Sequence, residues 1–478
     1  MTDVQDPDSL RFALGILDYD VAALRPHFPG YPVFMAIVML FHAMSGSISA
    51  AFTIVGGIAT YLLCKGALRA VNAPLASPEG VLMIMLILFN PLIWTMGNRF
   101  MPDLLGAAVV VWIFTLLVRR DPPPGRDLIV GLFLTGLLAG IRLSYLPLVI
   151  VPMFAGLKRS GRWGSGIAAL LLGLLLWLIP LAVDTGLPEL YHAADRQAEG
   201  HFEDFGGTIE TIPDIDVRRT SFLQGMIADG LGGWWPGRAL LTIITSIGLI
   251  ILFARGLWWL FDRETDGILI GIISLSLYIG WIILYQNIVY QPRHILPIVP
   301  FVLMIAWAGG QRLMRGSAWE RGVVILVLCA YALTGIVLAL QGREPTAIAQ
   351  VARYLRADSM SDSVSDSQSE SVRDRHIVST DLICDYLRLN GVEGTYHIID
   401  PLRPACSRLS RELAGVSPLY VIGWFDDCID HEWDRRLRFR HNPFVNAVWP
   451  EIPVAIDDGD SGDVIADTTE RVDAEEQR

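Results

Sequence analysis

Acidic residues occur in two places of this sequence where a carboxylate could do chemistry at the outer surface of a membrane. Asp8 stands in an N-terminal segment that also carries Asp6, Asp18 and Asp20. Asp103 follows "GNRFMP" at the start of an apolar run, and an acid at that depth should face other helices or water because lipid solvates a charge poorly. The alternative for Asp103 is a first-turn acid that the helix dipole favours. A functional role for Asp103 at the mouth of a membrane helix is favoured over this alternative.

Two further segments supply cationic groups. Arg142 occurs in "GIRLSYLP", and Arg293 and His294 are adjacent in "YQPRHILP". A guanidinium binds two phosphate oxygens at once, so these residues could form a clamp for a phosphate. The alternative is that they anchor helix ends near the lipid headgroups. The residues by themselves leave both interpretations open.

The stretch "RPHFPGYPVF", residues 25–34, precedes an apolar run and is rich in proline. Pro29 and Pro32 predict a tight turn and then a helix, because proline suits the first helical turn. One interpretation is a stiff lead-in with an interfacial histidine and tyrosine. Because the acids and arginines are expected on the same side of the membrane, we predict instead that the stretch forms the rim of a site, with His27 and Tyr31 near the substrate.

The elements that must position these residues are membrane helices. Of the 478 residues, 53% are hydrophobic and 18% are charged, whereas a soluble domain carries about 25% charged residues. Several nearly uncharged apolar runs have the length of a membrane span. The net charge of −12 owes more than half to residues 455–478, with nine acids against two arginines. No basic footprint for nucleic acid is present. The apolar runs and the low content of charged residues predict an all-α polytopic membrane protein.

We predict about ten transmembrane helices, near residues 47–63, 80–97, 104–118, 127–141, 144–156, 163–184, 237–261, 267–285, 295–311 and 322–340. The stretch 31–45 is short for a span and predicts a re-entrant or interfacial helix. Basic residues favour cytoplasmic loops, which puts residues 1–31, the loop 186–236 and the C-terminal region outside the cytoplasm. The same rule favours two short helices within 127–156, since one long helix would put the basic cluster 158–162 on the other side of the membrane.

The C-terminal third differs in composition from the rest of the chain. We predict five regions: an extracytoplasmic catalytic segment (1–31), a membrane domain (32–341), a linker with a Ser/Asp-rich tract (342–375), a small α/β extracytoplasmic domain (376–454) and an acidic disordered tail (455–478). "RHIVST", "GTYHIID" and "SPLYVIGWF" predict strands, and "DLICDYLRLNG" predicts a helix closed by Gly391. Cysteines 384, 406 and 428 fit no zinc spacing. The cluster 426–434, "DDCIDHEWD", is interpreted as a solvated acidic loop, with a metal site as the alternative.

Taken together, these motifs resemble the GT-C fold, that of integral-membrane glycosyltransferases such as protein O-mannosyltransferases and lipid A aminoarabinose transferases. The resemblance covers roughly residues 6–341 and rests on the first external acid, "PHFPGYP", the acid after "FNPLIWTMG", and "QPRHILPIVP". It implies that Asp8 is the catalytic base and that Asp103 is the second external acid. It also implies a membrane helix before Asp8, which we expect to be missing from this sequence.

The implied activity is inverting transfer of a sugar, a hexose or a pentose, from a polyprenyl-phosphate carrier to an acceptor hydroxyl at the outer membrane face. The acceptor could be a protein, a lipid or a glycan, and the location is the plasma or inner membrane. No cofactor or metal cluster is identified, although Asp-rich loops leave a divalent metal open. One alternative is a transporter or flippase, which would show ionisable residues at mid-helix depth and internal repeats. Another is a non-catalytic membrane protein whose external domain binds a partner.

Overall fold

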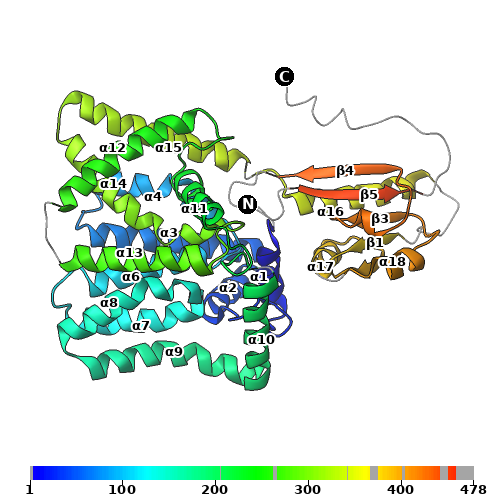
Figure 1. The fold of residues 1–478 in the computed structure, drawn as a ribbon, viewed down its shortest axis with the longest axis horizontal. Coiled ribbons are helices and arrows are strands. Elements are labelled where there is room, and N and C mark those ends of the chain that lie inside the picture. The colour runs from blue at the N-terminus through cyan, green and yellow to red at the C-terminus, as the bar shows by residue number, and fades with distance from the viewer. Residues whose placement is uncertain are drawn as a thin grey trace. The chain divides into compact units, whose positions relative to one another are not determined.

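The computed structural model describes residues 4–204, 206–261, 266–341, 343–365, 375–400, 404–441 and 451–458. These residues form two compact units along the chain. The first is helical and contains the described residues from 11 to 343. The second contains residues 4–10 and the described residues from 344 onwards, including a five-stranded sheet. Figure 1 labels the elements of both.

Helices that run back and forth make up the first unit, and α10 runs across their ends (Figure 1). Its helices are α2 (Pro32–Ser45), α3 (Ile48–Ala70), α4 (Pro78–Leu88), α5 (Pro91–Gly97), α6 (Asp103–Leu117), α7 (Gly125–Arg142), α8 (Leu146–Ser160), α9 (Trp163–Thr185), α10 (Leu187–Glu199), α11 (Ile215–Gln224), α12 (Leu241–Phe261), α13 (Asp266–Tyr285), α14 (Val299–Met314) and α15 (Ala318–Gln341). Short turns of 3-10 helix are η1 (Leu143–Tyr145) and η4 (Pro292–Ile295), and π-helical turns are η2 (Gly200–Asp204) and η3 (Gly225–Gly230). Helix α1 (Pro7–Leu17) begins among the residues of the second unit and ends among those of the first.

The structure confirms a multi-helical unit with several candidate membrane spans but does not confirm the predicted count of ten. Among the described residues, six helical segments are long and apolar enough to cross a membrane, or seven if α4 and α5, which are bent by 66° at a break, form one span. One of the six, residues 125–160, comprises both α7 and α8. Helices α2, α6 and α14 are apolar but have only 14, 15 and 16 residues. A crossing needs about 20 apolar residues, so length and composition do not confirm the count of ten, while α2 is short as expected.

The segment 125–160 folds into a helical hairpin, as the distribution of basic residues requires. Helix α7 ends at Arg142, and α8 begins four residues later. Gly156 near the end of α8 lies so close to Leu128 at the start of α7 that an added Cβ would be 3.5 Å from a methyl group of that leucine. The two helices therefore run back along each other, with Arg142 at the turn.

Glycines allow two pairs of helices in this unit to touch backbone to backbone. A Cβ at Gly136 of α7 would overlap the carbonyl of Leu170 in α9, and one at Gly173 of α9 would overlap the carbonyl of Phe133 in α7. Gly256 and Gly309 form a similar reciprocal contact between α12 and α14. Small residues at such crossings are typical of membrane helices. Apolar side chains are solvated as well by lipid as by protein, so close packing must supply the attraction between the helices.

Helix α6 lies inside this unit, whereas other helices show apolar surface. All residues of α6 except Trp112 are buried, and α6 packs against α3, α7 and α8. In contrast, α9 exposes Leu172, Leu176 and Ile179. A large exposed apolar surface indicates contact with lipid, so α9 is an outer helix and α6 a central one.

The sheet of the second unit has the order β2-β1-β3-β5-β4. Its strands are β1 (His376–Ser379), β2 (Thr395–Ile398), β3 (Leu419–Ile422), β4 (Arg435–Arg440) and β5 (Glu451–Asp457), and its helices are α16 (Ala347–Ser365), α17 (Asp381–Leu389) and α18 (Cys406–Glu412). Strand β1 is parallel to β2 and β3, while β5 is antiparallel to β3 and β4. The predicted strands β1, β2 and β3 and the helix α17 are present, and all four residues of β3 are buried.

Helix α16 occupies a region that the sequence predicted to be a linker. Its Val351 and Leu355 are fully buried, and its Tyr354 ring lies 5.7 Å from that of Phe439 in β4. The hydroxyl of Tyr420 in β3 donates a hydrogen bond of 2.5 Å to Asp358. The helix is therefore part of the α/β unit, and of the predicted linker only residues 366–374, together with residue 342, lie outside the described residues.

Strands β4 and β5 were not predicted, and β5 extends into the region expected to be a disordered tail. Residues 455–457 belong to this strand, and the remainder of that region from residue 459 lies outside the described residues.

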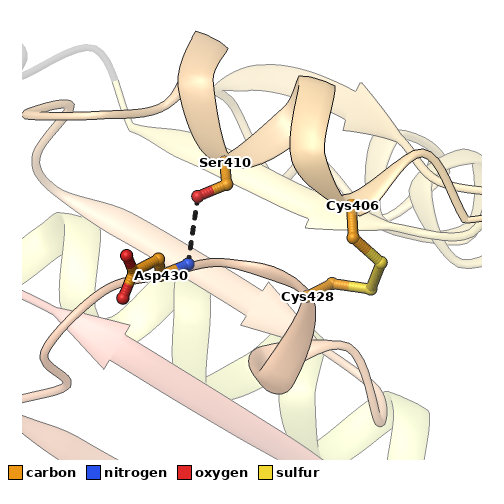
Figure 2. Close-up of a disulfide and its surroundings, with 4 residues drawn as sticks. All are labelled: Cys406, Ser410, Cys428 and Asp430. Carbon is orange, nitrogen blue, oxygen red and sulfur yellow. Dashed lines mark hydrogen bonds between the residues drawn. A yellow bond between two sulfur atoms is a disulfide. The ribbon is translucent and has the colours of Figure 1, made fainter.

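A disulfide joins Cys406 at the start of α18 to Cys428 (Figure 2). The sequence did not predict it, because cysteine spacing alone does not define a pairing. Among the described residues, no group of three or more His, Cys, Asp or Glu side chains is placed to hold a metal ion. The cluster 426–434 contains a 3-10 turn at Asp426–Cys428, and its acids at 427 and 430 are exposed.

The glycine contacts predict which helix crossings tolerate a methyl group. In Gly173→Ala the new Cβ would collide with the backbone of α7, which cannot move aside as a side chain can, so α9 must shift away. We expect a lower temperature of unfolding, measured on purified protein as the loss of the folded peak in size-exclusion chromatography after heating. Gly271→Ala in α13 is the control, because nothing lies within 4 Å of its Cβ position. Equal unfolding temperatures for both variants would contradict the close contact.

Candidate functional site

Asp103 is the centre of a buried polar network in the helical unit. Its side chain is 0% exposed, and its Oδ1 lies 3.1 Å from Nη2 of Arg142. The same oxygen accepts a hydrogen bond of 3.3 Å from the Tyr145 hydroxyl. Its Oδ2 has no hydrogen-bond partner among the described residues. No side chain caps α6, so this carboxylate joins α6 to the α7–α8 turn instead of capping its own helix.

Arg142 is buried in protein and does not face outward as a headgroup anchor would. Its side chain is 6% exposed. Besides the ion pair, Nη1 donates a hydrogen bond of 3.2 Å to the Tyr31 hydroxyl. The guanidinium carbon lies 5.6 Å from the ring centroid of Tyr31 and 5.9 Å from that of Tyr145, within range of cation–π attraction. A single cation thus links α2, α6 and the α7–α8 turn.

Tyr31 and His27 belong to the same network. The Tyr31 hydroxyl lies 2.8 Å from His27 Nε2, in hydrogen-bond contact. Phe12 packs edge-on against both rings, at 4.9 Å from Tyr31 and 6.1 Å from His27. Tyr31 has φ 49° and ψ 46°, a left-handed conformation that is strained for a residue with a Cβ. Strain of this kind is held in place by surrounding contacts and concentrates at functional sites.

The turn before Tyr31 is built by contacts that only glycine permits. Gly30 has φ +81°, and a Cβ on it would lie 2.5 Å from the Tyr19 hydroxyl oxygen. That hydroxyl donates a hydrogen bond of 2.9 Å to the Gly30 carbonyl. Burial and the nearby Asp184 raise the pKa of Tyr19, so Tyr19 remains a protonated donor. The predicted tight turn is present, and it delivers Tyr31 to Arg142.

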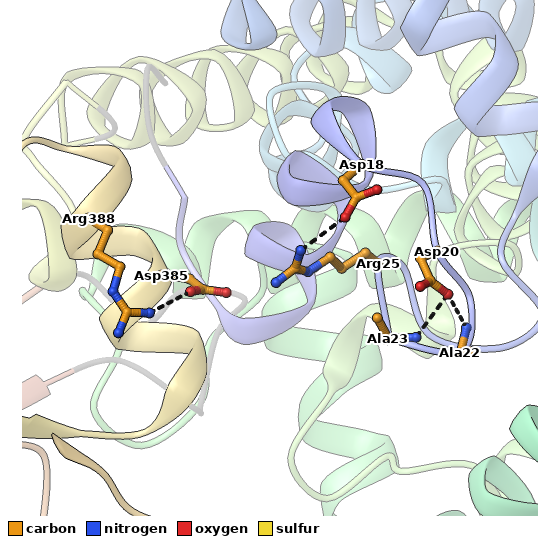
Figure 3. Close-up of polar contacts among 7 residues, drawn as sticks. All are labelled: Asp18, Asp20, Ala22, Ala23, Arg25, Asp385 and Arg388. Carbon is orange, nitrogen blue, oxygen red and sulfur yellow. Dashed lines mark hydrogen bonds and ion pairs between the residues drawn. The ribbon is translucent and has the colours of Figure 1, made fainter. Parts of the chain in front are cut away.

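Asp18 and Asp20 shape the preceding loop (Figure 3). Asp20 Oδ1 accepts hydrogen bonds from the backbone N–H groups of Ala22 and Ala23. Asp18 pairs with Arg25 at 3.2 Å and is 68% exposed. These two acids thus have structural partners in their own loop.

Gly106 lets the α7–α8 turn approach α6. It lies one helical turn after Asp103, and a Cβ at this position would come within 3.0 Å of Arg142 Cβ and of the Tyr145 ring. A larger residue would therefore push both partners away from the Asp103 carboxylate.

Two tyrosines extend the network towards η4. The rings of Tyr145 and Tyr278 meet edge-on at 6.1 Å. The Tyr278 hydroxyl donates a hydrogen bond of 3.2 Å to the backbone carbonyl of His294. Arg293 and His294 are both buried, at 4% and 7% exposure. The tyrosines were not predicted, although Tyr145 is three residues after Arg142 and Tyr278 carries a hydroxyl within an apolar run.

Of the predicted site residues, the structure brings Asp103, Arg142, Tyr31 and His27 into one network and connects His294 to it. Arg293 is buried in the same turn, η4. Asp8 is half-buried in the first turn of α1 and belongs to the second unit. That Asp8 and Asp103 share one site stays a prediction, as do the individual chemical roles of all these residues.

The fold of the chain is similar to solved structures of ArnT from Cupriavidus metallidurans. The structure bound to undecaprenyl phosphate has a TM-score of 0.55 and 13% identity, over 95% of this chain and 94% of that chain. The apo-state structure has a TM-score of 0.50 at the same identity and coverage. No family model and no curated protein matches the sequence. ArnT is a lipid A aminoarabinose transferase, so the predicted resemblance to the GT-C fold is confirmed at the level of the fold.

The Asp103–Arg142 pair predicts a characteristic stability pattern. Arg142→Gln leaves a buried carboxylate without its cation, and removing one partner of a buried pair costs about 3–5 kcal/mol. We expect a clear drop in unfolding temperature for Arg142→Gln and partial recovery in the double variant Asp103→Asn/Arg142→Gln, in which no charge is stranded.

The control for this pattern is Arg315→Gln. Arg315 pairs with Glu79 at 2.9 Å but is 66% exposed, and exposed pairs contribute little. A double variant less stable than Arg142→Gln would contradict the buried pair.

Proposed function

We propose that this protein is an integral-membrane glycosyltransferase that transfers a sugar from a polyprenyl-phosphate carrier to an acceptor hydroxyl at the outer membrane face. The observation that carries the proposal is the buried network around Asp103, which brings together acidic, basic and hydroxyl side chains from three segments that are distant in the sequence. An ionisable network among apolar helices is costly and indicates a functional site. The similarity of the fold to ArnT bound to undecaprenyl phosphate supports a polyprenyl carrier.

The proposed reaction is a single displacement. Asp8 takes the proton of the acceptor hydroxyl, and the acceptor oxygen attacks the anomeric carbon of the sugar. The bond between that carbon and the phosphate oxygen breaks, and the lipid phosphate leaves with the electron pair. Attack from the side opposite the leaving group inverts the anomeric centre.

The network residues have complementary roles in this proposal. Arg142, Arg293 and His294 offset the negative charge that develops on the leaving phosphate. Asp103 holds Arg142 in place and orients the acceptor or a water. His27 and Tyr31 contact the sugar or the acceptor from the rim of the site. A groove between apolar helices accommodates the polyprenyl tail.

In this proposal the second unit lies outside the cytoplasm, and its disulfide supports that location. Disulfides persist in oxidising compartments and are rare in the cytosol. The Cys406–Cys428 bond therefore supports an extracytoplasmic location for this unit, in agreement with the distribution of basic residues in the loops.

The direct test is to incubate the purified protein with a panel of polyprenyl-phosphate sugars and to measure release of the lipid phosphate. In Asp8→Asn the side chain keeps its shape but cannot take the acceptor proton. We expect turnover to fall on the order of 10²–10⁴-fold, with donor binding unchanged, and Asp103→Asn should also lower turnover.

Asp18→Asn and Asp20→Asn are the matched controls, because both acids have structural partners in their own loop. Full loss in Asp20→Asn with normal turnover in Asp8→Asn would move the base to another residue of the same segment. Wild-type rates in these two variants and also in Asp8→Asn and Asp103→Asn would refute the proposed glycosyltransferase activity.

Arg293 gives a separate test of phosphate binding. Arg293→Ala should weaken use of the donor more than Arg293→Lys does, because lysine keeps the charge but loses the bidentate fork. The measurement is the KM for the donor. Unchanged KM in both variants would exclude Arg293 from the phosphate site.

A further inference from the structure

A cavity of about 480 Å³ lies beside the disulfide in the second unit. Pockets that hold small molecules have volumes of about 300–1,000 Å³. It is lined on one side by Cys406, Ser407 and Ser410 of α18 and on the other by residues of the segment 426–436, which follows β3 and includes the start of β4. Figure 2 shows the disulfide that joins α18 to this segment.

The wall formed by the segment 426–436 is fixed at several points. The disulfide joins it to α18, and Ser410 Oγ accepts a hydrogen bond of 3.1 Å from the backbone N–H of Asp430 (Figure 2). Nε2 of His431 lies 2.7 Å from the carboxylate of Asp457 in β5. The cavity is therefore preformed, and a ligand would not have to order this segment on binding.

The cavity combines an aromatic ring with hydrogen-bond acceptors. Trp433 is half-buried, and it packs partly on the apolar core of the unit. The carboxylates of Asp427 and Asp430 are exposed and make no hydrogen bond or ion pair with any described residue. Asp426 is paired with Arg436 at 3.4 Å. The lining residues thus include three aspartates and one arginine, so the lining is negatively charged.

We propose that this cavity binds a sugar ring, either neutral or carrying an amino group. The indole offers a flat apolar surface to the C–H face of a sugar. Carboxylates accept charge-assisted hydrogen bonds from its hydroxyl or ammonium groups. The negative lining repels sugars that carry a phosphate or a carboxylate. The inference concerns binding alone and stands whether or not the helical unit transfers a sugar.

Binding can be measured on the full-length protein in lipid nanodiscs, which avoids detergents with sugar headgroups. The probes are glucose, glucosamine, glucuronate and glucose 6-phosphate, and the readout is saturation-transfer NMR on the sugar protons. We expect transfer to glucose and glucosamine and little to the two anionic sugars. Signal from none of the four, or equal signal from the anionic sugars, would overturn the proposal.

Trp424 provides a matched control, because it is 61% exposed in the same unit and does not line the cavity. Trp433→Ala should weaken binding on the order of tenfold or more, and Trp424→Ala should leave it unchanged. Because Trp433 also touches the core, the double variant Asp427→Asn/Asp430→Asn is a second test at exposed positions and should weaken glucosamine binding more than glucose binding. Full binding in both the Trp433 variant and the double Asn variant would refute the site.

The outcome is separable from that of the proposed transferase. Asp103→Asn should retain sugar binding in this assay even though its turnover falls. Sugar binding without any donor turnover would support the cavity as a sugar-binding site and refute only the proposed transferase activity.

Discussion

The ion pair between Asp103 and Arg142 is the interaction on which the arrangement of the polar network depends. Removing two charges from water costs several kcal/mol for each ion, and their mutual attraction repays this only with good geometry and additional hydrogen bonds. The structure supplies them, with Tyr145 donating to the carboxylate and Arg142 donating to Tyr31. Well-packed apolar residues would often be as stable at such a place. The pair is therefore better explained by the chemistry it makes possible than by the stability it adds.

Several backbone features have a common explanation in this pair. Gly106 gives the α7–α8 turn room against α6, and Gly30 allows the turn that presents Tyr31 in a strained conformation. In the same way, glycines bring α9 against α7, the helix that ends at Arg142. Close backbone contacts resist displacement, because a core packed to this density has few alternative arrangements. The network is thus positioned by closely packed helices together with the Gly30 turn and the α7–α8 turn.

Several members of the polar network could be predicted from residue types, because charged and proline-rich segments stand out in an apolar sequence. Asp103, Arg142, His27 and Tyr31 were found in this way. Tyr145 and Tyr278 were missed, because a tyrosine in an apolar run is more often a packing residue. The conformation of Tyr31 also carries no sequence signal. Only tertiary contact gives these tyrosines their roles.

The fold was predictable to a similar degree and for similar reasons. The hairpin α7–α8 followed from the basic residues, which report on topology directly. The number of crossings is not settled by helix length, because α6 is enclosed by other helices and need not match the thickness of the bilayer. The sequence of α16 ends in a Ser/Asp-rich tract, so its composition suggested a linker, although its apolar side chains contact the sheet. Strand β4 alternates arginine with apolar residues over most of its length. This is the pattern of an edge strand with one buried face, but its four arginines make the segment resemble a polar loop.

The charge balance of the network explains why the proposed reaction needs more than one arginine. Arg142 uses Nη2 for Asp103 and Nη1 for Tyr31, so its charge is already matched by a carboxylate. A lipid phosphate that enters this network brings further negative charge into a region where water does not screen it. A second cation must then offset the phosphate, or Arg142 must be shared between phosphate and Asp103. Arg293 is buried next to His294, whose carbonyl is held by Tyr278. In the proposed enzyme, Arg142 therefore keeps the acid in place and Arg293 takes the larger share of the phosphate.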